Sequence, residues 1–243
     1  MLNAIKLIHI LGKNDSDFIP DESAFIIQTC QRSIILQTIP VSLNNVVMAN
    51  PFEYFEGKEA YLFLLETICG LKSKLLGESE VVSQFKEAFS KYIAGSTRSN
   101  VIIKVLEKLF KDAKDIRREY LLEIGQQSYA GISRKILQTY TSTDNKVLIL
   151  GSGKLAFDVI KQLGKKFEIY LSARNLEKSI ELIAKFPELN ITFVDWGAKS
   201  GFSHFQNIIN TIGSDTIIFD HNFFTTRKNK NLFIDLGSPS IIK

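Results

Sequence analysis

The spacing of hydrophobic positions changes along the chain, and each change predicts a different kind of element. Residues 4–10 and 24–39 are dominated by β-branched and other apolar side chains, which is typical of strands. Residues 59–69 and 78–92 repeat apolar side chains at helical spacing, with glycines between the two runs. Residues 1–98 are therefore predicted to form a mixed α+β domain of the kind that carries a catalytic site.

The next segment has the period of an amphipathic helix. Its apolar positions, separated by lysines, are Ile102, Val105, Leu106, Leu109, Phe110 and Ala113. Residues 112–119 carry charges of both signs and, taken alone, indicate a solvated helix face. The polar run 141–145 ends the pattern and predicts a domain boundary. Residues 99–143 are thus expected to complete the N-terminal domain as a helical segment.

Beyond this boundary, short apolar strands alternate with helices. The expected strands are 147–150, 168–172, 191–194, 207–211 and 232–235, and the expected helices are 154–163 and 176–186. This alternation implies parallel strands covered by helices. Residues 144–243 are therefore predicted to form a Rossmann NAD(P)-binding domain, and the whole chain belongs to the α/β class.

A glycine-containing turn between the first strand and helix of this domain fits the fingerprint G-x-G-x-x-G/A. The turn consists of Gly151, Ser152, Gly153, Lys154, Leu155 and Ala156. Gly151 permits the tight turn, Gly153 lets the backbone approach a pyrophosphate, and Ala156 allows close helix–strand packing. A purely structural turn is the alternative, but the order of strand, turn, helix and second strand favours cofactor binding.

The end of the second strand of this domain indicates which dinucleotide is bound. A domain that prefers NAD places an acid there for the ribose 2′-hydroxyl, whereas this sequence has Ser172, Arg174 and Asn175. A guanidinium suits a 2′-phosphate. We therefore expect NADPH as the cofactor; an Arg174 that merely flanks a helix is the alternative.

Composition and charge narrow the class of protein. Hydrophobic residues make up 45% and charged residues 23% of the 243 residues, as in globular proteins with a buried core. The net charge of +4 is compatible with a polyanionic partner without indicating one. Two cysteines and three histidines predict neither a disulfide framework nor a metal site. Without a predicted signal peptide or membrane span, we expect a cytoplasmic protein that binds neither membrane nor DNA.

One cysteine has a cation close to it in the sequence, in the run Thr29, Cys30, Gln31, Arg32. A nearby cation favours the thiolate, which is the form that attacks carbonyl carbons. A cysteine within an apolar strand is more often a core residue. The spacing alone leaves both interpretations open.

Segments spread over most of the chain match the motifs of one enzyme family, in the family's order. They are residues 28–33 (S-T-C-N-R-T in the family), 70–78 (G-L-D-S-x-V-L-G-E), 84–89 (Q-V-K-x-A-Y), 109–113 (L-F-x-x-A), 114–119 (K-x-V-R-x-E), 151–156 (G-A-G-x-M-G), 173–175 (N-R-T) and 234–239 (I-D-I-A-V-P). Together they resemble glutamyl-tRNA reductase, the oxidoreductase that starts tetrapyrrole (porphyrin, haem) biosynthesis by the five-carbon route.

This resemblance implies a chemistry for the cysteine. Cys30 would attack the ester carbonyl that joins glutamate to tRNA(Glu), and the thioester would take a hydride from NADPH to release glutamate-1-semialdehyde. The resemblance also implies that Arg32 pairs with the glutamyl carboxylate, and that Thr29 and Ser73 contact the substrate. A downstream aminomutase that takes the aldehyde is a further implied partner.

Other residues in the matching segments have less defined roles. Either substrate binding or a structural role fits Glu78 and Gln84. Arg117 and Arg118 fit contacts to tRNA or to the substrate pocket. Cys69 ends an apolar helix and is expected to be a core residue.

The sequence also departs from the family pattern. Phe63 stands where the family has a histidine that assists the chemistry, and a phenyl ring neither donates a proton nor holds a charge. Ile34 replaces the acid that follows the cysteine segment, and the stretch before Cys30 is shorter and lacks the S-H-K-x-A-P motif. Weakened activity is therefore expected, unless His9 or another group substitutes.

The sequence stops soon after the last expected strand, so the family's C-terminal dimerisation domain is expected to be absent. We accordingly expect a compact, divergent member that is a monomer or an atypical dimer. A non-catalytic paralogue with a regulatory or binding role, and a dehydrogenase of another tetrapyrrole precursor, are the alternatives to an active reductase. The segment around Cys30 together with residues 77–78 favours the reductase.

Overall fold

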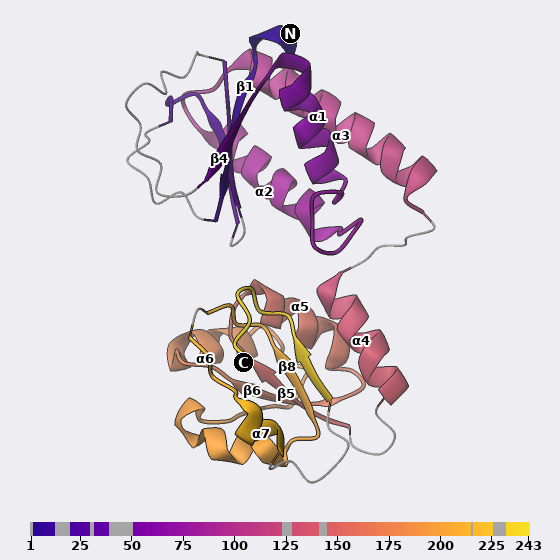
Figure 1. The fold of residues 1–243 in the computed structure, drawn as a ribbon, viewed down its shortest axis with the longest axis vertical. Helices are drawn as coiled ribbons and strands as arrows, with labels where there is room; N and C mark the ends of the chain where they lie inside the picture. The colour runs from indigo at the N-terminus through magenta and orange to yellow at the C-terminus, as the bar shows by residue number, and fades with distance from the viewer. Residues whose placement is uncertain are drawn as a thin grey trace. The chain divides into compact units, whose positions relative to one another are not determined.

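The computed structural model describes residues 2–12, 20–29, 32–38, 51–122, 128–140, 145–214, 216–225 and 232–243. The chain divides into two compact units, Met1–Ser128 and Tyr129–Lys243, and each is described by itself (Figure 1). Within the described ranges, no helix combines the length and the apolar character that crossing a membrane requires.

The first unit is an antiparallel four-stranded sheet with helices packed on one face (Figure 1). The strand order is β2-β3-β1-β4, with β1 at Lys6–Leu11, β2 at Phe25–Gln28, β3 at Arg32–Gln37 and β4 at Phe52–Glu56. The helices are η1 (Leu2–Ala4), α1 (Gly57–Ile68), α2 (Glu80–Ala94) and α3 (Asn100–Tyr120). This arrangement confirms the α+β class predicted for the N-terminal half.

Alternate strand positions of this sheet meet the helices in one apolar core. Leu7, Phe25 and Leu36 are fully buried there against residues of α1, α2 and α3. The predicted apolar face of α3 is buried, apart from Phe110, which is partly exposed. Burying an aliphatic side chain of this size contributes about 1.5–3 kcal/mol. The amphipathic period of α3 therefore positions this helix on the sheet.

Two parts of the sheet differ from the strands predicted by sequence. The single run expected over residues 24–39 is a pair of antiparallel strands, because backbone hydrogen bonding between Thr29 and Arg32 closes a hairpin. β4 was not predicted, since this short edge strand is half exposed and has glutamates at both Glu53 and Glu56. It pairs with β1 in antiparallel register.

The second unit is a parallel sheet of the Rossmann type, as predicted. Its order is β7-β6-β5-β8-β9, with β5 at Lys146–Leu150, β6 at Glu168–Ser172, β7 at Ile191–Phe193, β8 at Asn207–Asn210 and β9 at Leu232–Asp235. The helices are α4 (Tyr129–Tyr140), α5 (Lys154–Leu163), α6 (Leu176–Ile183), η2 (Trp196–His204) and α7 (His221–Thr225). The chain reverses its direction of strand addition between β5 and β8, which is where such sheets bind dinucleotides.

Both faces of β5 are buried, because successive side chains of a strand point to opposite faces. Val147 and Ile149 pack with residues of α4, α5 and α6. Leu148 and Leu150 pack on the other face in a cluster that includes Phe202 of η2. The short apolar strand predicted at residues 147–150 is therefore the centre of this unit.

α4 packs within the second unit. Its Ala130 and Leu137 are buried in the cluster that contains Val159 and Ile160 of α5. The polar run 141–145 predicted the domain boundary, so residues 99–143 were expected to belong to the N-terminal half. In the structure, the division between the units falls after Ser128.

Candidate active site

The helix-facing side of the first sheet becomes polar toward one end. Residues aligned across the strands form successive rows, which are Phe25, Leu36, Leu7 and Phe55, then Ile27, Ile34, His9 and Glu53, then Thr29, Arg32 and Leu11. The first row is apolar, the second contains a histidine and a carboxylate, and the third contains a hydroxyl and a guanidinium. The register of the strands thus gathers polar groups where β2 turns into β3.

The β2–β3 hairpin is closed by three hydrogen bonds between Thr29 and Arg32. The Thr29 N–H donates to the Arg32 carbonyl oxygen over 2.9 Å. The Thr29 hydroxyl donates to the same oxygen and accepts from the Arg32 N–H, both over 3.0 Å. Cys30 and Gln31, which separate these two residues in the sequence, lie outside the described residues. The hydroxyl expected to contact substrate is therefore used, in this structure, to hold the ends of the hairpin.

Arg32, Ser73 and Glu78 lie together beside this hairpin. The Arg32 guanidinium donates to the carbonyl oxygen of Lys72 and interacts with the charge of Glu78. Ser73 is hydrogen-bonded to the Glu78 carboxyl. Burial raises the pKa of Glu78, as does nearby Glu80, whereas Ser73 and Arg32 act in the opposite direction. Burial lowers the pKa of Arg32, against the influence of Glu78. Three residues predicted to bind substrate are thus brought together.

Arg117 holds the loop that carries Ser73 and Glu78. Its Nη1 donates to the carbonyl oxygens of Cys69 (2.9 Å) and Glu78 (3.5 Å), and its Nη2 donates to that of Gly77 (3.0 Å). Gly70, in the same loop, has φ +77°, and a Cβ there would lie 2.6 Å from the Glu78 nitrogen. Only glycine fits such a backbone without strain. Arg117 therefore contacts the backbone of the loop that carries Ser73 and Glu78.

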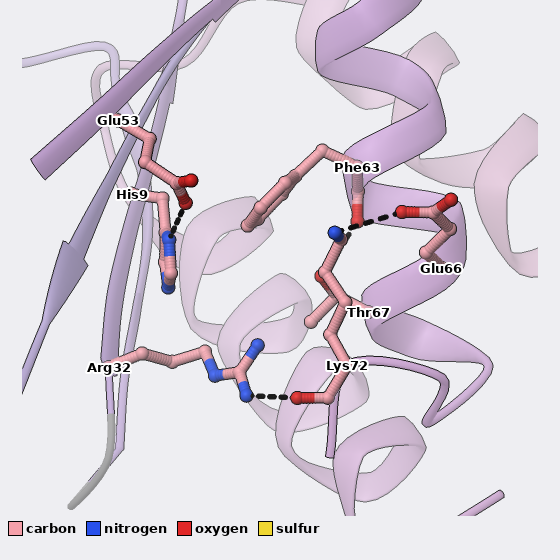
Figure 2. A network of polar contacts seen from close by, with 7 residues as sticks. All are labelled: His9, Arg32, Glu53, Phe63, Glu66, Thr67 and Lys72. Atoms are coloured by element: carbon pink, nitrogen blue, oxygen red, sulfur yellow. Dashed lines mark hydrogen bonds and ion pairs between the residues drawn. The ribbon is translucent and has the colours of Figure 1, made fainter. Parts of the chain in front are cut away.

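His9 lies in the middle of the polar end of the sheet. Its Nδ1 is 2.8 Å from Oε2 of Glu53, and its side chain is 6% exposed whereas that of Glu53 is 60% exposed. Burial lowers the pKa of His9, Glu53 raises it, and the positive charges of Arg32 and Lys72 lower it further. In the described part of the chain, Nε2 of His9 has no hydrogen-bond partner. Figure 2 shows this nitrogen at the end of the ring away from Glu53, on the side where Arg32 extends.

Phe63 of α1 packs directly against the histidine. The centroids of the two rings are 4.8 Å apart, and Phe55 stacks on Phe63 at 4.7 Å. The ammonium of Lys72 lies 4.7 Å from the Phe63 centroid and 3.0 Å from a carboxylate oxygen of Glu66 (Figure 2). A cation over a phenyl face is attracted by the ring quadrupole. Phe63 is thus a buried packing residue that borders both His9 and Lys72.

The glycine turn of the second unit has the backbone that its sequence predicts. Gly151 has φ +109°, and a Cβ there would lie 2.5 Å from Oγ1 of Thr211. Gly153 has no atom within 4 Å of the position of a Cβ and is the N-cap of α5, without a side-chain cap. Ala156 is fully buried under the sheet. The open space beside Gly153, at the N-terminus of α5, fits an approaching phosphate.

The residues predicted to recognise the adenosine end follow β6. The Ser172 hydroxyl is buried without a hydrogen-bond partner among the described residues, while its carbonyl oxygen accepts from the Gly151 N–H over 2.8 Å. Arg174 is exposed. The Asn175 side chain accepts from the N–H of Lys178 over 2.9 Å and so caps α6. The end of β6 is thus joined to the glycine turn through the Ser172 carbonyl, and the exposed Arg174 follows two residues later.

Comparisons with known proteins agree with both halves of this description. Residues 13–120 match the family model for the N-terminal domain of glutamyl-tRNA(Glu) reductase, and residues 132–243 match the model for shikimate/quinate 5-dehydrogenase. Over 231 residues the chain is 26% identical to glutamyl-tRNA reductase of Thermosipho melanesiensis. The chain belongs to the glutamyl-tRNA reductase family.

Relatives in the glutamyl-tRNA reductase family are longer than this chain. The alignment to the Thermosipho protein covers 90% of this chain and 59% of that protein. Glutamyl-tRNA reductase of Thermoplasma acidophilum is 32% identical over 190 residues, which are 76% of this chain and 44% of that protein. The chain thus spans about half the length of these curated relatives. A solved glutamyl-tRNA reductase from Methanopyrus kandleri aligns with 99% of this chain and 68% of its own at 17% identity, with a TM-score of 0.48; the family assignment rests on the sequence matches.

The remaining candidate residues of this glutamyl-tRNA reductase homologue are less central. Gln84 lies partly buried in the second turn of α2. Arg118 is exposed, and its Nη2 lies 3.7 Å from Oδ1 of Asp115. Cys69 is buried, as expected of a core residue. Sequence reasoning missed Glu53 and Lys72. The aromatic and acidic residues of β4 could have pointed to Glu53 as part of a strand, and the change from the acid of the family's G-L-D-S motif could have pointed to Lys72.

Proposed function

We propose that this chain reduces glutamyl-tRNA(Glu) to glutamate-1-semialdehyde with NADPH, through a thioester on Cys30. The observation that carries the proposal is the grouping of Arg32, Ser73 and Glu78 in a chain of this family. Arg32 adjoins Thr29 across a closed hairpin, and these two residues flank Cys30 and Gln31 in the sequence. Two of the residues that we assign to substrate binding, Thr29 and Arg32, therefore flank the cysteine in the sequence.

The glutamyl transfer that we propose conserves atoms and protons. The thiol loses its proton, the thiolate sulfur bonds to the ester carbonyl carbon, and the bond from that carbon to the ribose oxygen breaks. The ribose oxygen leaves with a proton as the tRNA hydroxyl. A guanidinium two residues from Cys30 favours the thiolate, and Arg32 is also the group that we assign to the free carboxylate of the substrate.

For the reduction, we propose NADPH as the cofactor. When bound, it supplies the hydride that converts the thioester to an aldehyde and a thiolate. The open side of Gly153 and the start of α5 would hold the pyrophosphate. Ser172 and Arg174 would hold the ribose and its 2′-phosphate, because a guanidinium pairs well with a dianionic phosphate. The aldehyde leaves the protein free for another cycle.

The proposal is tested by incubating the purified chain with glutamyl-tRNA(Glu) and NADPH and measuring semialdehyde formation. The wild type and the buried-cysteine control Cys69→Ala should form product, whereas Cys30→Ser should form none, because a hydroxyl is a far weaker nucleophile than a thiolate. Product from Cys30→Ser at the wild-type rate would overturn the thioester mechanism. No product from the wild type, under conditions where a full-length relative is active, would overturn the proposed function.

A further inference from the structure

The last residues of four strands in the second unit form a row across the carboxyl edge of the sheet. The register aligns Ser172 of β6, Leu150 of β5, Asn210 of β8 and Asp235 of β9. Leu150 directly precedes the glycine turn in the sequence. A carboxamide and a carboxylate therefore lie side by side at the ends of β8 and β9, on the edge of the sheet where the glycine turn lies.

Asn210 and Asp235 belong to one network of hydrogen bonds. Asn210 is fully buried, and its Nδ2 donates to Oδ1 of Asp235 over 2.7 Å and to the carbonyl oxygen of Ile212 over 2.8 Å. Its Oδ1 accepts from the Ile212 N–H over 3.0 Å. The Asp235 carboxylate also accepts from the Gly237 N–H over 2.9 Å and from the Ser240 hydroxyl. The loops that follow β8 and β9 are thus tied to each other through one carboxylate.

The loop after β8 packs against the glycine turn as well as against the loop after β9. The Thr211 hydroxyl donates to the carbonyl oxygen of Leu150 over 2.6 Å, and a Cβ on Gly151 would lie 2.5 Å from the oxygen of this hydroxyl. A Cβ on Gly213 would lie 2.3 Å from the carbonyl oxygen of Ser238. The three loops therefore approach each other closely, so a shift of the loop after β9 would displace the loop after β8.

The order of the strands determines which half of a dinucleotide would face these loops. In the proposed function, the glycine turn after β5 holds the pyrophosphate and Arg174 after β6 holds the 2′-phosphate. β6 and β8 lie on opposite sides of β5. Because the pyrophosphate joins the two nucleosides, a dinucleotide with its adenosine half on the side of β6 extends its nicotinamide half toward β8. Residues 211–213 would therefore face the nicotinamide half.

We infer that Asp235 is a positioning residue for the nicotinamide half of the cofactor and acts through Asn210 and the loop after β8. The inference rests on the proposed function. The carboxylate does not itself contact the cofactor; it fixes the backbone of residues 211–213, against which the nicotinamide half lies. A backbone that is fixed before the ligand arrives loses less conformational entropy on binding.

Packing alone does not account for this polar pair. One position earlier in the two strands, Ile209 and Ile234 are paired and buried in the apolar core. Burying an amide and a carboxylate costs free energy that their hydrogen bonds have to offset. Another pair of aliphatic side chains would join the strands without this cost. The polar pair supplies what aliphatic side chains cannot, which is directed hydrogen bonds to the backbone of both loops.

The inference is tested by isothermal titration calorimetry of the purified chain with NADPH and with adenosine 2′,5′-bisphosphate, which lacks the nicotinamide half. Asp235→Ala should raise the Kd for NADPH by about tenfold or more, the equivalent of one lost hydrogen bond to a charged group. It should leave the Kd for the bisphosphate unchanged. Asp235→Asn should restore NADPH binding, because its amide oxygen still accepts from Asn210 and Gly237.

Asp220→Ala is the matched control. This exposed aspartate of the same unit also accepts from a backbone N–H, that of Phe223 over 3.1 Å, but it belongs to neither loop. Both Kd values should stay unchanged in this variant. Where Asp235→Ala does not fold, Ser240→Ala replaces it, because Ser240 is exposed and its hydroxyl contacts the same carboxylate. The Kd of this variant should rise for NADPH alone.

The outcomes separate this inference from the proposed function. An unchanged Kd for NADPH in folded Asp235→Ala, or in Ser240→Ala where that variant replaces it, would overturn the inference. An equal rise for both ligands would also overturn it, because a general loss of structure weakens both halves alike, and so would a failure of Asp235→Asn to restore binding. In each of these cases the proposed cofactor stands. A wild type that binds neither ligand would overturn the proposed cofactor and this inference with it.

Discussion

At the scale of single residues, the site contains charged side chains whose partial burial lowers the stability of the folded protein. Glu78 is a carboxyl whose pKa is raised by burial, so keeping it ionised at neutral pH weakens the fold. Its compensation is Arg32, whose own charge is partly buried. Two half-buried charges that stabilise each other are expected where a charged substrate group has to be received.

Glu78→Gln should therefore make the protein more stable and less active. A raised pKa in the folded state means that the cost of ionisation is present above that pKa and disappears below the unfolded value. The variant's gain in Tm should accordingly be larger at pH 7 than at pH 4. Thermal unfolding at the two pH values measures this difference, and an equal gain at both would contradict the assignment of a buried, ionised carboxylate.

Arg174 is the residue on which we expect cofactor choice to depend. It is exposed just after β6. The acid that binds the ribose 2′-hydroxyl in NAD-preferring domains is missing at this position of the sequence. Arg174→Glu should weaken NADPH binding at least about tenfold, because a carboxylate repels the 2′-phosphate, while NADH binding holds or improves. Fluorescence titration of both cofactors measures the ratio of Kd values. An unchanged ratio would mean that Arg174 only flanks α6.

A functional residue could be predicted from the sequence when it lies in a contiguous motif, but not when its role depends on contacts between distant segments. Arg32, Ser73 and Glu78 lie in contiguous motifs, so the resemblance could identify them. The pairing of His9 with Glu53 depends on the register of β1 against β4, two strands separated by more than forty residues. No local pattern contains that register, and a one-residue slip would place Glu53 on the other face. The role of Arg117 likewise follows from loop carbonyls that only the folded chain brings within reach.

At the scale of elements, the loop between α1 and α2 is supported from α3. Arg117 binds the carbonyl oxygens of three loop residues, whereas its neighbour Arg118 is exposed on the surface. Arginine suits this task because its guanidinium presents several donors in a fixed plane. The helix thereby supports the loop that carries Ser73 and Glu78 through bonds to its backbone.

Arg117→Ala should destabilise the protein by about 2–3 kcal/mol, since it leaves buried carbonyl groups without their charged donor. It should also lower activity, because the loop loses its support. Arg118→Ala is the matched control and should change the free energy of unfolding by less than about 0.5 kcal/mol. Urea denaturation followed by circular dichroism measures both. Equal effects of the two variants would contradict the role given to Arg117.

α4 provides a test of the division between the two units. Leu137 is fully buried in the core of the second unit. Leu137→Ala should cost that unit about 2–5 kcal/mol, whereas exposed Tyr140 on the same helix should tolerate alanine. The single tryptophan, Trp196, lies in the second unit, so its fluorescence reports on that unit. A tryptophan transition that Leu137→Ala leaves unchanged would mean that α4 is not part of this core.

The periodicity of apolar residues was sufficient to predict some helices and strands from the sequence and insufficient for others. The 3.6-residue period of α3 and the apolar run of β5 are long or pure enough to be recognised from sequence. β4 was missed because it is five residues long and half exposed, so its alternation carries little apolar signal. α4 lies within the helical segment predicted over residues 99–143, and its buried face packs in the second unit; an amphipathic face does not identify the surface on which it packs.

At the scale of the whole molecule, the residues that we assign to acyl transfer and those that we assign to hydride transfer lie in separate units. The first unit gathers His9, Arg32, Ser73 and Glu78 on and beside an antiparallel sheet, and Arg32 is two residues from Cys30 in the sequence. The second has a glycine turn at the switch point of a parallel sheet, with open space beside Gly153. Membership of the glutamyl-tRNA reductase family joins these two chemistries into one proposed reaction, acyl transfer followed by hydride transfer.

The most direct measurement is a two-step experiment with labelled glutamyl-tRNA(Glu). In the absence of NADPH, the label should move from tRNA to the protein and map to the peptide containing Cys30. Adding NADPH should then release it as glutamate-1-semialdehyde, with one NADPH oxidised for each label released. Label that stays on tRNA, or that leaves the protein only as free glutamate after NADPH is added, would contradict the account.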